Sequence, residues 1–292
     1  MVKINRSAVA FVGDIHGLMD AFDTTIREGL RRGVTTFVQV GDFWLYSENN
    51  LRKMERVIAR HCLDFNVNPA EVRFYFIDGN HEDYTLIDPY SESPQVLSHH
   101  LMYLPRGYVK TIDCDGHLVN IGCAGGAVSI DQEWRTEGKD WWPEEKPAAE
   151  DFSNLNDSVD ILVSHDAPSK ASTMLLENGA FASIDYGEDI DRACREVVSL
   201  IDDVVQVTNP RLVFHGHYHR FQVTNDDDGH TIVSLGKNGE TGSMVIINQE
   251  TKEMTLPVLG NTIQGWLKDA TIPIDSLKGR DILSREELLD AQ

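Results

Sequence analysis

The sequence predicts an α/β fold, an αββα sandwich in which two mixed sheets pack face to face between outer helices. Two observations lead to this prediction. Short apolar segments alternate with amphipathic helical segments up to residue 77, and a series of further short strands follows after residue 100. The chain has 292 residues, 41% of them hydrophobic, which is enough to bury a large core.

The first part of the chain has the pattern strand, helix, strand, helix, strand. Apolar runs at 8–12, 35–40 and 72–77 predict three strands. Apolar residues at helical spacing predict helices over 18–32 and 51–65. Because this order requires right-handed crossovers, we expect these strands to be partly parallel.

The second part predicts a hairpin, a buried strand, a helix and then consecutive antiparallel strands. Residues 108–112 and 118–121 flank the turn of the hairpin. The later elements are expected at 160–163 (strand), 189–206 (helix), and 212–214, 221–223, 231–233 and 244–247 (strands).

The chain is expected to form one main domain over residues 1–260. Residues 261–292 are less regular and are expected to be a C-terminal extension that packs on this domain or trails from it. Within them, the segment Ser284 to Glu287 has the pattern of a capping box before a short final helix.

Charge and composition limit the partners. With 26 Lys and Arg against 47 Asp and Glu, the net charge is −21, which disfavours long duplex nucleic acid. No apolar run approaches the ~20 residues of a membrane span, and the start lacks a signal-peptide core. The four cysteines are far apart, so we expect neither a disulfide framework nor a thiolate zinc site. We expect a cytoplasmic protein, in a bacterial host, without a membrane partner.

Polar clusters next to glycine follow five of the apolar strands. Because the carboxyl ends of strands gather around one crevice in α/β sheets, these clusters are expected to converge. A single Gly-Asp at a strand end is usually a turn, and a single histidine is usually structural, but neither explains five clusters. The clusters are 13–17, 41–42, 79–82, 164–166 and 216–219.

The residue types in these clusters indicate the class of ion. Carboxylates, imidazoles and one amide, without thiolates, suit Mn, Fe, Co, Ni or Zn. Six or seven such ligands are too many for one tetrahedral ion, and they fit two ions ~3.5–4 Å apart that share a carboxylate.

The five clusters together resemble the calcineurin-like metallophosphoesterase superfamily, of the small bacterial or phage type. The matching motifs, all in order between residues 13 and 219, are Asp14-x-His16, Gly41-Asp42, Gly79-Asn80-His81-Glu82, His165 and Gly216-His217-x-His219.

The resemblance implies a role for each matching residue. It implies that Asp14, His16 and His219 hold one metal ion. Asn80, His165 and His217 would hold a second, and Asp42 would bridge the two. A metal-bound hydroxide would attack phosphorus, and His81 would protonate the leaving oxygen.

The sequence departs from the Ser/Thr protein phosphatase branch of this superfamily. That branch has Gly-Asp-x-Val-Asp-Arg-Gly and Arg-Gly-Asn-His-Glu, whereas this chain has Phe43-Trp44 after Asp42, and Asp78 before Gly79. The two arginines that clamp phosphate in that branch are therefore missing. Arg106 is a candidate phosphate contact, and a surface arginine before a turn is the alternative.

The segment 125–147 is rich in aromatic residues. Trp134, Trp141 and Trp142 fall within nine residues, together with Arg135. Trp141 and Arg135 are candidate substrate contacts, as parts of a lid or a base-stacking platform. Alternatively, the rings pin an irregular loop to the sheet.

From these observations we expect a hydrolase of small phosphodiesters, with 2′,3′-cyclic nucleotides as candidate substrates. It would use two divalent ions, with Mn favoured over Fe, Zn, Ni or Co. One alternative is a phosphomonoesterase or phosphoprotein phosphatase. Another is a scaffold that keeps the fold without catalysis, although a scaffold could lose ligands and every expected ligand is present. The sequence does not determine the oligomeric state.

Overall fold

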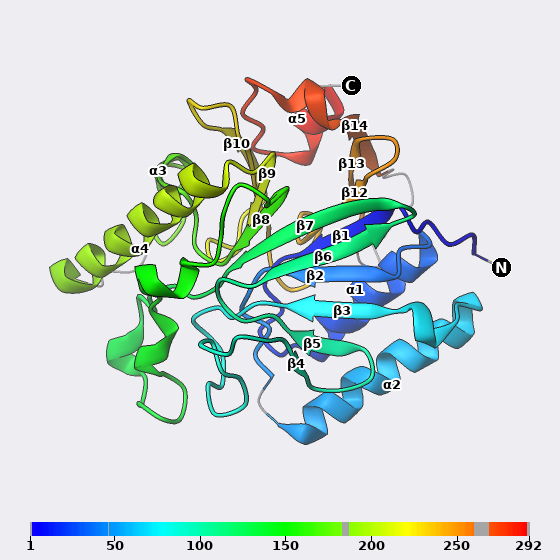
Figure 1. Ribbon diagram of the computed structural model, residues 1–292, viewed down its shortest axis with the longest axis horizontal. Helices are drawn as coiled ribbons and strands as arrows, with labels where there is room; N and C mark the ends of the chain where they lie inside the picture. Colours follow the sequence, from blue (N-terminus) through cyan, green and yellow to red (C-terminus); the bar gives the residue numbers. More distant parts are fainter. Residues whose placement is uncertain (1, 46, 183–186, 260–268, 291–292) are drawn as a thin grey trace.

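Two mixed sheets face each other between outer helices in the computed structural model (Figure 1). The structure describes residues 2–45, 47–182, 187–259 and 269–290. The predicted αββα sandwich is confirmed. In the described ranges, no helix is long and apolar enough to cross a membrane.

The first sheet has the order β14-β13-β12-β1-β2-β3-β5-β4. Strands β1, β2, β3 and β5 are parallel neighbours, whereas β12, β13, β14 and β4 join by antiparallel pairing. The strands are β1 (Ala8–Val12), β2 (Thr36–Gln39), β3 (Arg73–Phe76), β4 (Gln95–Val96), β5 (Leu101–Tyr103), β12 (Met244–Asn248), β13 (Glu253–Leu256) and β14 (Ala270–Pro273).

The second sheet has the order β10-β11-β9-β8-β7-β6. Its central strands are parallel, and each edge is an antiparallel hairpin. The strands are β6 (Val109–Cys114), β7 (His117–Ala124), β8 (Ile161–Ser164), β9 (Leu212–His215), β10 (Gln222–Asn225) and β11 (Thr231–Ser234).

Helices cover the outer faces of both sheets. The apolar faces of α1 and α2 pack on the first sheet, and those of α3 and α4 on the second. The bounds are α1 (Met19–Arg31), α2 (Glu48–Phe65), α3 (Ser169–Glu177), α4 (Gly187–Thr208) and α5 (Arg285–Asp290).

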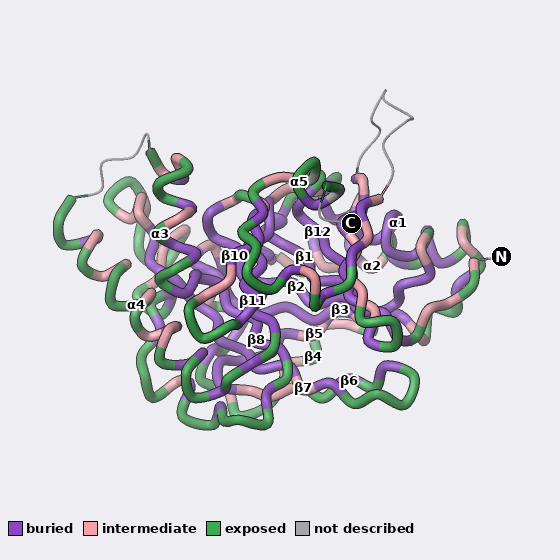
Figure 2. The backbone as a smooth tube through the Cα atoms, turned by 90° about the horizontal axis from the view of Figure 1, so that it is seen from above, coloured by how far each residue is buried: buried purple, intermediate pink, exposed green. Residues whose placement is uncertain are grey.

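The main core lies between the two sheets. Phe11 of β1 and Phe214 of β9 stack across the interface with ring centroids 4.0 Å apart. Buried residues are concentrated along the central strands, while the helices show exposed outer surfaces (Figure 2). Because both sheets contribute to this core, the ends of their strands are held in fixed relative positions.

The predicted series of antiparallel strands after residue 212 is partly wrong. Strand β9 pairs with β11 in parallel, and β12 belongs to the other sheet, antiparallel to β1. Only β10 and β11 form the expected hairpin. An apolar run predicts a strand, but the partner of that strand depends on contacts that are distant in sequence.

The C-terminal residues join both sheets. β14 is an edge strand of the first sheet, and Ile282 forms a bridge with Val223 of the second. Ser284 Oγ accepts a hydrogen bond from the Glu287 N–H, as the capping-box pattern predicts. Residues 269–290 therefore pack on the sandwich, whereas the proposed boundary at residues 260–261 lies outside the described residues.

Candidate metal centre

The predicted ligands meet at the carboxyl ends of five strands. Three of these strands belong to the first sheet and two to the second, so the site spans the end of the sandwich. The residues are Asp14 and His16 after β1, Asp42 after β2, Asn80 and His81 after β3, His165 after β8, and His217 and His219 after β9.

Four of these side chains form a first group. Asp14, His16, Asp42 and His219 each offer a ligand atom, and these atoms lie within 4.8 Å of one another. The Nε2 atoms of His16 and His219 are 2.9 Å apart, and His219 Nε2 is 3.1 Å from Asp14 Oδ2. Two imidazole nitrogens and two buried carboxylates thus point at one small volume.

A second group adjoins the first through Asp42. The Asn80 Oδ1 atom is 3.1 Å from His165 Nε2 and 2.9 Å from His217 Nδ1. His165 Nε2 also lies 3.3 Å from Asp42 Oδ1. Asp42 therefore faces both groups, the position that a bridging carboxylate must have.

The donor set fits divalent cations. Asp42 Oδ2 is buried and has no hydrogen-bond partner within the described residues, and a carboxylate oxygen in this state needs a cation. Carboxylate, imidazole and amide donors without thiolate suit first-row divalent metals. The seven residues named from the sequence would hold such ions.

The charges of this centre are strongly coupled. Burial raises the pKa of Asp42, but His165 and His81 outweigh burial and hold this pKa well below its usual range. Burial lowers the pKa of His165, but the Asp42 carboxylate outweighs it and raises this pKa to about 10. Burial, followed by His165, lowers the pKa of His217. The Asp42 carboxylate is therefore ionised and ready to bind a cation.

Glycines allow the ligand side chains to approach the backbone closely. A Cβ at Gly79 would lie 2.2 Å from Asp42 Oδ1, and one at Gly216 would lie 2.1 Å from Asp14 Oδ1. Both distances are shorter than van der Waals contact, so a side chain at either glycine would displace a carboxylate. This explains the glycine in these two motifs.

His81 lies beside the two groups with its ring partly exposed. The backbone N–H of His81 donates to Asp42 Oδ1 at 2.7 Å, and Arg135 Nη2 lies 3.0 Å from the ring atom Nε2 of His81. Burial lowers the pKa of His81 to about 4; Asp42 opposes this shift and Arg135 adds to it. Arg135, a predicted substrate contact, is thus placed next to the metal centre.

Arg106 has a different environment from either alternative given by its sequence. It is neither a surface residue nor free to bind phosphate, since its side chain is fully buried. Its guanidinium is 2.7 Å from Asp78 Oδ2 and 3.1 Å from Asp151 Oδ2. Asp78, which stands where protein phosphatases have arginine, is therefore the partner that holds Arg106 inside.

The tryptophans of segment 125–147 differ in their surroundings. Trp134 is 73% exposed. The Trp142 ring lies 6.3 Å from that of Tyr84. Trp141 is half-buried with its indole nitrogen enclosed, and its carbonyl accepts from the Gly138 N–H. The base-stacking role of Trp141 stays a prediction.

The sequence patterns did not identify three residues that lie near the metal centre, namely Trp44, Ser129 and Glu145. Trp44 lies 5.7 Å from His81 between ring centroids, and Ser129 accepts a hydrogen bond from the Asn80 amide. Ser129 follows the glycines after β7, so the rule of polar residues at strand ends could have found it. Nothing in the sequence distinguishes Glu145, which accepts two hydrogen bonds from Ser129, from its neighbour Glu144.

Comparison with solved structures gives matches at low sequence identity. TT1561 of Thermus thermophilus has a TM-score of 0.50 at 12% identity, with 87% of this chain and 98% of that chain covered. A dimetal phosphatase from Danio rerio has a TM-score of 0.46 at 12% identity, with coverage of 91% and 98%. GAP50, the anchor in the inner membrane complex of Plasmodium, has a TM-score of 0.49 at 10% identity, with coverage of 97% and 93%.

Comparison with curated proteins gives no match. The family model of the calcineurin-like phosphoesterases matches residues 7–221, which include all seven predicted ligands and His81. Because this match covers more than half of the sequence, the chain belongs to the calcineurin-like phosphoesterase family.

Proposed function

We propose that this protein hydrolyses small phosphodiesters, with 2′,3′-cyclic nucleotides as candidate substrates, and that it uses two divalent ions, preferably Mn. The observation that supports this most directly is the position of Asp42 between two groups of donors, 3.3 Å from His165 and 3.8 Å from His16. Family membership supports the reaction class, hydrolysis of a phosphoester.

The metal ions, when bound, would lower the pKa of a water molecule and neutralise charge on the phosphate. Asp14, His16, Asp42 and His219 would hold one ion, and Asn80, His165 and His217 would complete the site of the second together with Asp42. All the carboxylates and the second group of donors are buried, so their positions are fixed before any ligand arrives.

In this proposal, His81 transfers a proton to the leaving oxygen. The His81 side chain is 18% exposed, while the Asp42 carboxylate is 1% exposed, so His81 is the more accessible of the two to a substrate. The pKa of His81 is low in the free protein, and the negative charge of a bound phosphate would raise it. Arg135 Nη2 lies 3.0 Å from His81 Nε2 and 2.7 Å from Asp131 Oδ2, and in this proposal the guanidinium also binds a phosphate oxygen.

Charge supports the proposed preference for a diester. A diester has one negative charge, whereas a monoester at neutral pH has between one and two, because its second pKa is about 6. Arg106 forms ion pairs with Asp78 and Asp151, so it does not bind the second negative charge of a monoester. The net charge of −21 also opposes a doubly charged substrate more than a singly charged one.

A substrate panel tests the proposal. We expect kcat/KM for bis-nitrophenyl phosphate and a 2′,3′-cyclic nucleotide to equal or exceed that for nitrophenyl phosphate and a phosphopeptide, at one Mn concentration. A clear preference for the phosphopeptide would refute the diesterase assignment. Absence of bound divalent ions, together with no activity after adding Mn, Fe, Zn, Ni or Co, would favour a scaffold.

A further inference from the structure

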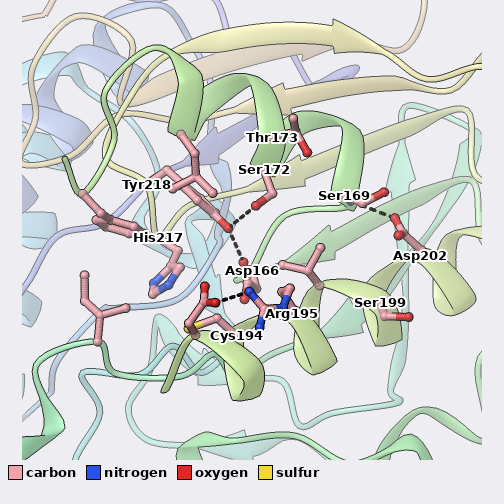
Figure 3. A pocket seen from close by; sticks show the side chains of 15 residues that line it. Asp166, Ser169, Ser172, Thr173, Cys194, Arg195, Ser199, Asp202, His217 and Tyr218 are labelled. Carbon is pink, nitrogen blue, oxygen red and sulfur yellow. Dashed lines mark hydrogen bonds and ion pairs between the residues drawn. The ribbon is translucent and has the colours of Figure 1, made fainter. Parts of the chain in front are cut away.

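A cavity of about 420 Å³ lies between α3 and α4, next to the metal centre (Figure 3). His217, one of the predicted ligands, forms part of its wall. The Nδ1 atom of His217 is 2.9 Å from Asn80 Oδ1, so a single side chain borders both the cavity and the second ligand group. The cavity therefore adjoins the second ligand group and lies within reach of the organic part of a substrate whose phosphate is at the metal centre.

Part of the cavity wall is aromatic and aliphatic. Phe181, Leu176, Val198 and Ile130 line it. The Phe181 ring lies 5.3 Å from that of His217 and stacks with Tyr218 at 5.1 Å between centroids. Apolar walls of this size with a few polar groups are typical of sites for small molecules, and aromatic side chains in the wall suit a flat aromatic ligand.

Polar groups inside the cavity are buried and fixed. The Tyr218 hydroxyl lies 2.7 Å from Ser172 Oγ and donates to Asp166 Oδ1 at 3.1 Å, as Figure 3 shows. All three side chains belong to residues less than 7% exposed. They can accept or donate hydrogen bonds at the edge of a ring.

Carboxylates at the cavity determine the charge of its occupant. Asp191 and Asp202 line it in addition to Asp166, and the Arg195 guanidinium is paired with Asp191. A second phosphate or an acidic peptide would face like charges here. An uncharged group whose edge carries amino or hydroxyl donors would instead be stabilised.

We propose that this cavity binds the nucleobase of a mononucleotide phosphodiester whose phosphate lies at the metal centre. A nucleobase is flat, uncharged and edged with hydrogen-bonding groups, so it matches the Phe181 ring, the aliphatic walls and the buried polar groups. This inference rests on the proposed function and names the substrate class of the same site.

Filling the cavity tests the inference. Val198→Trp would place an indole in it, and Val207→Trp is the matched control, because Val207 is on the same helix, is 60% exposed and does not line the cavity. We expect Val198→Trp to weaken binding of adenosine to the Mn-loaded protein by about 10-fold or more, as loss of a stacked base would. KM for 2′,3′-cyclic AMP should rise by a similar factor, and Val207→Trp should change neither value.

Adenosine has no phosphate, so its binding, measured by calorimetry, separates the cavity from the reaction. Equal adenosine affinity in the two Trp variants, or no adenosine binding by the wild type, would overturn the inference while leaving diester hydrolysis intact. The inference would also be overturned if Trp141→Ala lost adenosine binding while Val198→Trp kept it. The wild type could instead bind adenosine, lose this binding on Val198→Trp, and yet hydrolyse no diester. That result would support nucleobase binding in the cavity and refute the proposed function. If Val198→Trp does not fold, Phe181→Ala replaces it, with the same expected loss.

Discussion

Asn80 Nδ2 donates a hydrogen bond of 3.0 Å to Ser129 Oγ, and this bond fixes which end of the Asn80 amide faces the histidines. The Ser129 hydroxyl donates in turn to Glu145 Oε2 at 2.7 Å, and the Ser129 N–H donates to Glu145 Oε1 at 2.6 Å. With its nitrogen held in this way, Asn80 directs Oδ1 toward His165 and His217. Segment 125–147 therefore has a positioning role.

Ser129→Ala should weaken metal binding at the second group by about 10- to 100-fold, the usual effect of removing a partner that orients a ligand. Glu145→Gln should have a smaller effect in the same direction. Calorimetric titration of the apoprotein with Mn would measure both. Glu144→Gln, which changes an exposed neighbour, is the control, and equal Mn affinity in the Glu144 and Glu145 variants would contradict the role of Glu145.

The stability of the metal-free protein should depend on the protonation of Glu145. Burial raises the pKa of Glu145 to about 7 from its usual 4.5, although hydrogen bonds from Ser129 oppose the shift. The folded state then binds more protons than the unfolded state, so stability falls as pH rises through this window. The free energy of unfolding relative to Glu145→Gln should decrease by up to about 3 kcal/mol between pH 4.5 and pH 8. Urea denaturation in EDTA would measure these free energies of unfolding. If the stability of the wild type relative to Glu145→Gln rose with pH, the raised pKa of Glu145 would be contradicted.

Asp42→Ala should remove the carboxylate that the two groups share, and both ions should then bind weakly. Without this carboxylate, two dications would face each other without a shared anion. Metal analysis after dialysis should show fewer than two ions for each chain. Asp157→Ala, at an exposed aspartate, should keep the wild-type metal content. Full metal content and normal turnover in the Asp42 variant would rule out the bridging role.

His81→Ala should retain the metal ions and slow turnover by about 10²- to 10⁴-fold, the range for a general acid. The loss should be smaller for nitrophenolate esters, because that leaving group hardly needs a proton. Comparing kcat for a series of leaving groups would measure this. The same loss across the whole series would show that His81 positions the substrate or the nucleophile instead.

Arg106→Met should destabilise the fold by about 3–5 kcal/mol, because it leaves the Asp78 charge buried without its partner. KM should change little in the folded fraction. Arg135→Met should have the opposite profile, with a raised KM and little change in the free energy of unfolding, since Arg135 lies beside His81. Urea denaturation and steady-state kinetics on both variants test this contrast. If the Arg106→Met protein were as stable as the wild type and had a raised KM, Arg106 would be a substrate contact and not a structural residue.

The sequence by itself determined the αββα class and the candidate ligands of the metal centre. Both depend on local patterns: apolar runs of strand length, and polar residues next to glycine at strand ends. Because parallel strands place their carboxyl ends at one edge of a sheet, local position along the chain is enough to predict that Asp14, Asp42 and Asn80 converge after β1, β2 and β3.

Only the tertiary structure decided the contacts between segments that are distant in sequence. It placed β12 beside β1, buried Arg106 against Asp78 and brought Glu145 under Ser129. The sequence pattern around each of these residues is the same whether the side chain is exposed or buried. Their environments depend on which surfaces pack together, and that choice is made by the total burial of the two sheets and their helices rather than by any local preference.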